Sequence, residues 1–198
     1  MLKPFLYFIQ SILIYFFFLV GKLLGLKISR KIFSFIFLNI APIFKSKKII
    51  ESNLKIFNQD LSDKEKKKII ENMWKNYGMT FIEYIHLDFF KKNNSSIKIS
   101  GEQNLLSIKN KKPVIFISGH FANFELMSMA ITKNDIKLAT IYRPLNNYFL
   151  NPFMEYLREK YVCKNQIKKG VNGVRHAIEY LKKNHCIALM VDQRVSEG

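Results

Sequence analysis

One stretch decides the fold of this chain: Val114-Ile115-Phe116-Ile117-Ser118-Gly119-His120-Phe121-Ala122-Asn123-Phe124-Glu125. It opens with an apolar, β-prone run that stops at Ser-Gly, which is typical of a buried strand ending at a turn. Beyond Glu125, the apolar residues Leu126, Met127, Met129 and Ala130 follow an apolar helix pattern. The stretch therefore predicts a strand, a short turn and a helix, which together are a basic unit of α/β folds.

The turn of this stretch carries a histidine, and a glutamate follows five residues later. On an ideal helix five residues advance by about 500°, so the two side chains would point about 140° apart. They can meet only if His120 lies on the turn and Glu125 lies in the first turns of the helix. The carboxylate would then hold the imidazole in one tautomer, and the other ring nitrogen could take a proton from a hydroxyl group. The alternative is a surface histidine near a helix N-terminus, where the helix dipole favours Glu125.

Strands and helices alternate from about residue 97 to residue 191. We expect strands at 97–100, 114–118, 137–142 and 187–191, an extended piece at 162–167, and helices at 101–110, 122–133 and 150–160 and after Asn172, the last with Val174, Ala177, Ile178 and Leu181 on one face. The alternation predicts an α/β fold with a mixed, largely parallel sheet flanked by helices. Because the last strand ends so close to Gly198, we also expect that the C-terminal part of the fold is missing.

Three polar residues come directly after predicted strands: His120, Arg143 and Asp192. In parallel α/β sheets, binding and catalytic sites collect beyond the carboxyl ends of the strands. We therefore expect these three side chains to share one site. The alternatives are a turn role for Arg143, which precedes Pro144, and a capping role for Asp192.

The N-terminal segment is strongly apolar. Residues 5–20 carry no charge, and as a helix they would measure about 24 Å, slightly less than a hydrocarbon core. We expect a membrane-anchoring helix here, with a cleaved signal peptide and a buried core helix as alternatives. A second apolar segment, residues 32–44, lies between basic clusters and is expected at the membrane surface. This predicts an anchor and interfacial segment over residues 1–48, and an α/β domain over residues 49–198 on the cytoplasmic side.

Composition narrows the classes of function. The formal charge of +17 points to an anionic partner, and 48% hydrophobic residues exclude a disordered polycation. Two cysteines provide no disulfide framework, and the histidines show no metal-ligand spacing. No phosphate-binding glycine loop or nucleic-acid-binding motif is present.

Ser62-Asp63-Lys64-Glu65 is a capping box, and it predicts the start of a long helix whose apolar face contains Trp74 and continues to Phe89.

The chain resembles the bacterial lipid A late acyltransferases (the lauroyl and myristoyl acyltransferase family), within the lysophospholipid acyltransferase superfamily. The resemblance extends over about residues 95–198, and the apolar N-terminus and the helix with Trp74 fit upstream. Glu125 in place of an aspartate, and Gly119 before the histidine, favour the lipid A branch over glycerol-phosphate acyltransferases. The motifs that carry it are Gly119 to Glu125, Tyr142-Arg143-Pro144-Leu145-Asn146-Asn147, Gly170-Val171 ahead of Arg175, and Val191-Asp192-Gln193.

The resemblance implies transfer of a fatty acyl chain from an acyl-carrier-protein thioester, or from acyl-CoA, to a hydroxyl of a lipid A precursor at the bacterial inner membrane. His120 would be the general base, assisted by Glu125. Arg143 would bind a phosphate or an oxyanion, and Asp192 would position substrate. Asn123, Arg158 and Arg175 are further candidates for substrate binding.

The expected partners are acyl carrier protein, the lipid A precursor and an anionic membrane, without nucleic acid, and no cofactor or metal is expected. The alternatives are an acyltransferase of the same superfamily acting on another glycolipid or a glycerolipid, and a non-catalytic, basic, membrane-bound protein.

Overall fold

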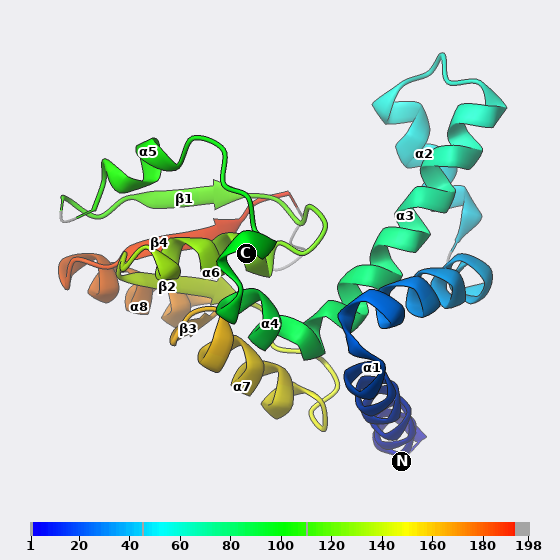
Figure 1. Ribbon diagram of the computed structural model, residues 1–198, viewed down its shortest axis with the longest axis horizontal. Coiled ribbons are helices and arrows are strands. Elements are labelled where there is room, and N and C mark those ends of the chain that lie inside the picture. The colour runs from blue at the N-terminus through cyan, green and yellow to red at the C-terminus, as the bar shows by residue number, and fades with distance from the viewer. Residues whose placement is uncertain (1, 45, 110, 193–198) are drawn as a thin grey trace. The chain divides into compact units, whose positions relative to one another are not determined.

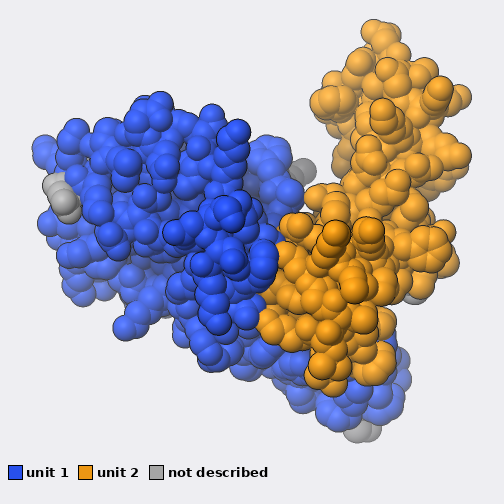
Figure 2. All heavy atoms as spheres, in the orientation of Figure 1, with its two compact units in different colours: residues 1–15, 87–198 blue, residues 16–86 orange. Residues whose placement is uncertain are grey.

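The computed structural model describes residues 2–44, 46–109 and 111–192 and divides the chain into two compact units (Figures 1 and 2). Unit 1 comprises residues 1–15 and 87–198, and unit 2 comprises residues 16–86. Lys45 of the predicted basic flank and Gln193 of the last motif lie outside the described residues.

Unit 1 is built on a four-stranded sheet with the strand order β1-β4-β2-β3. The strands are β1 (Ile115–Ser118), β2 (Leu138–Tyr142), β3 (Asn165–Lys168) and β4 (Cys186–Met190), and each neighbouring pair is parallel. Ile115 pairs with Ile187, and Ala139 pairs with both Ile187 and Asn165. The predicted α/β fold with a parallel sheet is confirmed, and all four carboxyl ends meet at one edge.

Helices connect these strands. The connecting helices are α6 (Glu125–Lys133), α7 (Asn151–Tyr161) and α8 (Val171–Lys182), and two shorter helices, α4 (Leu87–Lys92) and α5 (Glu102–Leu106), precede β1. The chain runs from β1 to β2 and on to β3 in one direction, and α8 then reverses it to insert β4 between β1 and β2. Because parallel connections are right-handed, this reversal puts α6 and α7 on one face of the sheet and α8 on the other. A core under α8 contains Ala139, Ile167, Ala177 and Ile187.

The apolar N-terminus is helical, as predicted. Helix α1 (Leu2–Ile40) breaks at Gly25, where φ is 74°, and a 3₁₀ turn, η1 (Ala41–Phe44), follows it. By length and composition, the segment Leu2–Ile43 is the one helix among the described residues that could cross a membrane. Residues 2–15 belong to unit 1 and the rest of α1 belongs to unit 2.

Unit 2 is helical. It contains the larger part of α1, then α2 (Lys47–Phe57), α3 (Asp63–Glu83) and the 3₁₀ turn η2 (Tyr84–His86). The predicted capping box is present, since the Ser62 side chain accepts a hydrogen bond from the Glu65 backbone and the Glu65 carboxylate accepts one from the Ser62 backbone. The ring of Phe81 packs near Phe18 and Phe33, and Arg30 donates to the buried carboxylate of Glu83 over 2.6 Å.

Three local predictions are wrong. Residues 97–100 form no strand, and the long helix from residue 63 ends at Glu83 instead of continuing to Phe89. Helix α8 is capped by Gly170 instead of Asn172, and it buries Gly173 and Ala177 while Val174 and Ile178 are exposed. A Cβ on Gly173 would lie 2.2 Å from the Lys168 carbonyl oxygen, so the helix approaches the sheet through a residue that no apolar pattern detects. The predicted division at residue 48 concerns membrane contact, and it stays a prediction.

One 3₁₀ turn and one loop lead from α4 to α5. The turn η3 (Asn94–Ser96) follows α4, and residues 97–101 lead into α5. Ile97 has extended backbone angles, with φ −127° and ψ 115°, so the local preference for an extended chain is realised. It becomes a strand only where a neighbouring strand supplies the hydrogen bonds.

Candidate active site

A tight turn at the carboxyl edge of the sheet carries His120. Strand β1 ends at Ser118, the backbone N–H of Phe121 donates to the Gly119 carbonyl over 2.9 Å, and α6 begins at Glu125. Ala122 has a φ of 45°, an unfavourable left-handed conformation for a residue with a Cβ. The turn therefore places the imidazole at the sheet edge with a strained backbone beside it.

Asp192 holds this histidine through two hydrogen bonds. Its Oδ1 lies 2.7 Å from His120 Nδ1, and its Oδ2 accepts from the His120 backbone N–H over 2.8 Å. The pairing of β4 with β1 continues past the strand end, because the Val191 N–H donates to the Ser118 carbonyl over 3.0 Å. That continued pairing brings the residue after β4 against the turn after β1. Two of the three residues predicted to share a site are thus in contact.

The contact defines the tautomer of the imidazole. Two hydrogen bonds from His120 hold the pKa of Asp192 below its usual range, and the bond from the backbone N–H has the larger effect. Asp192 is therefore ionised at neutral pH and can only accept, so Nδ1 of His120 carries the proton that it donates. In the neutral form of this imidazole Nε2 carries the lone pair, and within the described residues Nε2 has no hydrogen-bond partner. The side chains of His120 and Asp192 are 32% and 38% exposed, which leaves the pair accessible to a substrate.

Gly119 and Phe124 complete the surroundings of this pair. A Cβ on Gly119 would lie 3.2 Å from Asp192 Cγ and Oδ2 and 2.9 Å from the Phe121 ring. Only glycine lets the carboxylate come this close to the turn. The Phe124 ring stands edge-on to the imidazole with 4.6 Å between centroids, so it limits rotation of the ring.

An ion pair lies behind the turn. Arg158 Nε, on α7, donates to Glu125 Oε1 at the start of α6 over 2.7 Å, and both side chains are buried. The guanidinium also lies over the Tyr142 ring, 5.7 Å from its centroid. Glu125 was predicted to orient His120. In the structure Nδ1 of His120 bonds to Asp192 and Glu125 bonds to Arg158, so the His120–Glu125 pairing stays a prediction.

The buried pair continues toward β3 through Tyr142 and through Glu155, a residue that the sequence did not suggest. The Tyr142 hydroxyl donates to Glu155, and Lys168 Nζ lies 3.6 Å from Glu155 Oε1. Burial, together with the hydrogen bond to Glu155, raises the pKa of Tyr142. Burial alone would raise the pKa of Glu155, but hydrogen bonds from Tyr142 and Asn151 and the charge of Lys168 bring it below its usual range. Glu155 therefore stays ionised and accepts from both neighbours.

The other candidate residues take different places. Arg143 follows β2 directly and is exposed, at the edge where His120 and Asp192 also lie. Asn123 is buried in the turn between His120 and α6. Arg175 is exposed on α8, and none of its described contacts connects it with His120. Among residues 2–44, 46–109 and 111–192, no group of three or more His, Cys, Asp or Glu side chains could hold a metal ion.

The family model described as "Bacterial lipid A biosynthesis acyltransferase" matches residues 2–198, nearly the whole chain. No curated protein matches the chain.

Proposed function

Because the chain belongs to the bacterial lipid A biosynthesis acyltransferase family, we propose that it moves a fatty acyl chain from an acyl-carrier-protein thioester to a hydroxyl group of a lipid A precursor. The observation that supports this most directly is the accessible His120–Asp192 pair at the carboxyl edge of the sheet. A neutral imidazole with a free Nε2 lone pair is a suitable base for a hydroxyl group.

The proposed reaction is a direct acyl transfer. The acceptor hydroxyl oxygen attacks the thioester carbonyl carbon while Nε2 of His120 takes the hydroxyl proton. The carbon–sulfur bond then breaks, and the imidazolium returns its proton to the departing thiolate, so the thiol and the new ester are the products. Asp192 stabilises the imidazolium formed between these steps through its bond to Nδ1. The thioester supplies the driving force, so we propose that neither a metal nor a cofactor takes part.

Glu125 has two candidate roles within this proposal. The spacing of His120 and Glu125 suggests that Glu125 orients the imidazole. The contacts suggest instead a positioning residue that fixes the start of α6 through Arg158. The two roles differ in what they predict for pH dependence. A carboxylate bonded to the imidazole would shift the pH profile of kcat/KM when it is neutralised, whereas a positioning residue would lower the rate and leave the profile in place.

Arg143 is proposed to bind the phosphate of the acceptor or the developing oxyanion of the thioester. It is exposed, it follows β2, and its planar donor fork suits a phosphate oxygen pair. We further propose that the charge of +17 attracts the acidic carrier protein and an anionic bilayer. The apolar α1 would hold the protein at the inner membrane, with the catalytic domain on the cytoplasmic side.

The test is acyl transfer by the full chain, measured with acyl carrier protein thioester and a lipid A precursor in mixed micelles. We expect His120→Ala to abolish ester formation. His176→Ala is the matched control, because His176 is an exposed histidine on α8, and we expect it to keep full activity. Normal transfer by His120→Ala would overturn the assignment of the base.

The acceptor is tested separately. Mass spectrometry of lipids from a strain that lacks the protein should show lipid A with one acyl chain fewer, restored by the unaltered chain. Unchanged lipid A together with a missing acyl chain on another glycolipid or a glycerolipid would keep the reaction and replace the acceptor.

A further inference from the structure

A buried asparagine joins the loop after β2 to the first turns of α1. Asn147 is 9% exposed and Ser11 is 2% exposed. Asn147 Nδ2 donates to the Tyr7 carbonyl over 2.9 Å, and its Oδ1 accepts from the Ser11 hydroxyl over 3.0 Å. The same Oδ1 accepts from the backbone N–H of Phe149 over 3.1 Å. One amide side chain thus fixes the loop and the helix to each other.

Aromatic contacts extend this junction along the helix. Tyr7 stands edge-on to Tyr148, and Phe8 stands edge-on to Phe149, with centroids 6.1 Å and 5.5 Å apart. The Tyr15 hydroxyl donates to the Phe149 carbonyl over 2.9 Å. The loop of residues 145–149 therefore contacts α1 at several points between Tyr7 and Tyr15, and both segments belong to unit 1.

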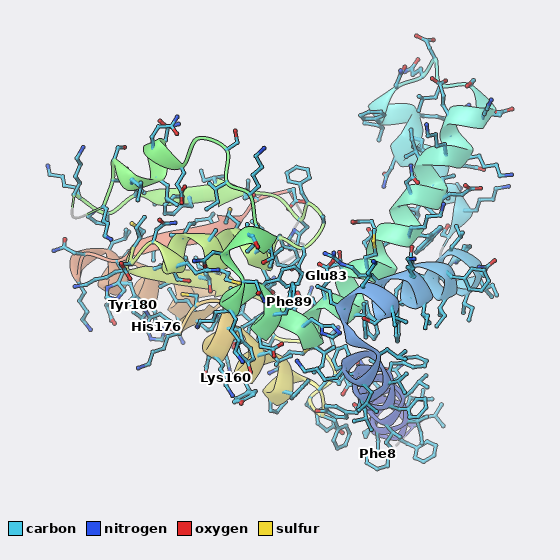
Figure 3. The ribbon with its side chains drawn as sticks, in the orientation of Figure 1. Phe8, Glu83, Phe89, Lys160, His176 and Tyr180 are labelled. Carbon is cyan, nitrogen blue, oxygen red and sulfur yellow. The ribbon has the colours of Figure 1, made fainter. Side chains whose placement is uncertain are left out.

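The outer surface of this junction is apolar and exposed. Residues 4–21 contain no charged side chain, and Lys3 and Lys22 flank them. The side chain of Phe8 stands at the outer end of unit 1 among other apolar side chains of α1 (Figure 3). The loop adds to this surface. The exposed large apolar side chains of the two segments are Leu2, Phe5, Leu6, Phe8, Ile9, Ile12, Leu13 and Tyr15 on the helix, and Leu145, Tyr148 and Phe149 on the loop.

An apolar surface of this extent marks an interaction site, and its composition favours lipid. The helix is apolar around its whole circumference, whereas a helix that docks on a protein shows one apolar stripe. Tyr7, Tyr15 and Tyr148 present aromatic rings with polar hydroxyl groups, which suits the boundary between hydrocarbon and headgroups. Lys3, whose ammonium group lies 6.0 Å from the Tyr7 ring centroid, adds a charge for anionic headgroups.

We propose that the loop of residues 145–149 is a second lipid-contacting element, held by Asn147 at a fixed depth relative to the first turns of α1. Arg143 lies two residues before this loop, so the loop sets the carboxyl end of β2 at the level of the lipid headgroups. The acceptor phosphate then meets the Arg143 guanidinium without leaving the bilayer surface. This rests on the proposed function only in that the acceptor is a membrane lipid.

The experiment uses tryptophan fluorescence of the full chain in vesicles of phosphatidylethanolamine and phosphatidylglycerol, with and without lipids brominated on their acyl chains. Trp74, the one tryptophan of the chain, is replaced by phenylalanine, and single tryptophans are placed at positions 5, 148 and 174. Phe5→Trp reports on the helix and Tyr148→Trp on the loop. Val174→Trp is the control, because Val174 is exposed on α8, on the other face of the sheet. If Trp74→Phe does not fold, the tryptophans are added to the unaltered chain and its own quenching is subtracted.

We expect bromolipid quenching at position 148 comparable to that at position 5 and several times that at position 174. Adding Asn147→Ala should reduce the quenching at position 148 and leave that at position 5 unchanged. Quenching at position 5 without quenching at position 148 would overturn the proposal while leaving the anchor intact. No quenching at either position would instead overturn the membrane association in the proposed function. If the tryptophan at position 148 is protected from quenching only when the protein dimerises, the loop contacts a second copy of the chain instead of lipid, and the proposal is overturned.

An activity measurement gives an independent result. Replacing Tyr148 and Phe149 with serine should raise the KM for an acceptor embedded in vesicles several-fold and leave the KM for the same acceptor in detergent micelles unchanged. An equal rise in both would mean that the loop contacts substrate directly, which contradicts the proposal.

Discussion

Two side-chain pairs of unit 1, one between a carboxylate and an imidazole and one between a carboxylate and a guanidinium, have the same length and opposite surroundings. His120 and Asp192 approach to 2.7 Å with about a third of each side chain exposed, and Glu125 and Arg158 approach to 2.7 Å with about a tenth exposed. In water an exposed pair contributes little to stability, whereas breaking a buried pair leaves a charge without compensation. The exposed pair is thus free to exchange protons with a substrate, and the buried pair is suited to hold α6 and α7 together.

The same comparison explains where the backbone is strained. The left-handed Ala122 and the close approach at Gly119 both flank the exposed pair. The buried pair joins two regular helices, each without a positive φ angle. Strain at functional sites persists only when the surrounding structure holds it in place. The buried pair is part of that surrounding structure, and four substitutions test this division of roles.

The largest effect is expected from Asp192→Asn. The asparagine amide can donate to Nδ1 of His120, which favours the tautomer with the proton on Nε2 and removes the base. We expect kcat for acyl transfer to fall by about 10²–10⁴-fold. Asp192→Asn with unchanged kcat would show that another group orients the imidazole, and Glu125→Gln in the same assay identifies whether Glu125 is that group through a shifted pH profile.

The same variant has a pH-dependent effect on stability. Because the pKa of Asp192 is lower in the folded protein than in the unfolded chain, its hydrogen bonds stabilise the fold above the usual aspartate pKa of about 3.9. This contribution is lost as the pH falls through the lowered pKa. Thermal unfolding should therefore separate the unaltered chain from Asp192→Asn at neutral pH and show no difference in strong acid.

The buried pair is tested by Arg158→Met. Removing the guanidinium leaves the Glu125 carboxylate buried without its cation, and we expect a loss of about 3–5 kcal/mol in the free energy of unfolding, measured by urea denaturation. The double variant with Glu125→Leu should recover most of this loss, because two apolar side chains leave no buried charge. The control is Lys109→Met, which breaks the exposed pair with Asp135 and should cost about 0.5 kcal/mol or less. Equal losses at both pairs would contradict the comparison.

These pairs also show how far the sequence leads. The strand before His120, the helix after it and the strands before Arg143 and Asp192 follow from apolar patterns, and so does the parallel sheet. The contact between His120 and Asp192 does not, because it depends on β4 inserting next to β1, and strand order is a long-range property. A reader of the sequence sees Glu125 five residues away and Asp192 seventy-two residues away, so local spacing points to Glu125, whereas the residue bonded to Nδ1 is Asp192.

Local patterns fail in two further places for physical reasons. Ile97 to Ser100 alternates like a strand, but none of the strands in the described part of the chain supplies its hydrogen bonds. Helix α8 turns Gly173 toward the sheet, so the apolar residues Val174 and Ile178 mark the exposed face instead of the buried one. Arg158 was a candidate for substrate binding, and the sequence did not indicate which residue it contacts. In the structure it forms a buried ion pair with Glu125.

A smaller effect is expected from Gly119→Ala. Its Cβ would lie 3.2 Å from Asp192 Cγ, so the carboxylate must shift by a few tenths of an ångström, while the exposed Phe121 ring can turn away. We expect kcat to fall about tenfold or less, because small misplacements near the reacting atoms already slow a reaction. If the shift acts through Asp192, Gly119→Ala should have no further effect in the Asp192→Asn background. Additive losses would show that the turn contributes by another route.

The smallest effect is expected from Ala122→Gly. Glycine removes the left-handed strain of about 1–2 kcal/mol but makes the unfolded chain more flexible, which offsets about 0.4–1 kcal/mol. The net gain of about 1 kcal/mol or less should raise the melting temperature by about 2–4 °C or less. The control is Asn184→Gly, since Asn184 has a similar φ of 57° after α8 and asparagine adopts this conformation easily. A higher melting temperature for Ala122→Gly but not for Asn184→Gly, together with a lower kcat for Ala122→Gly, would mean that the strained turn holds His120 against Asp192. An equal rise in melting temperature for both variants would mean that the strain has no role in the site.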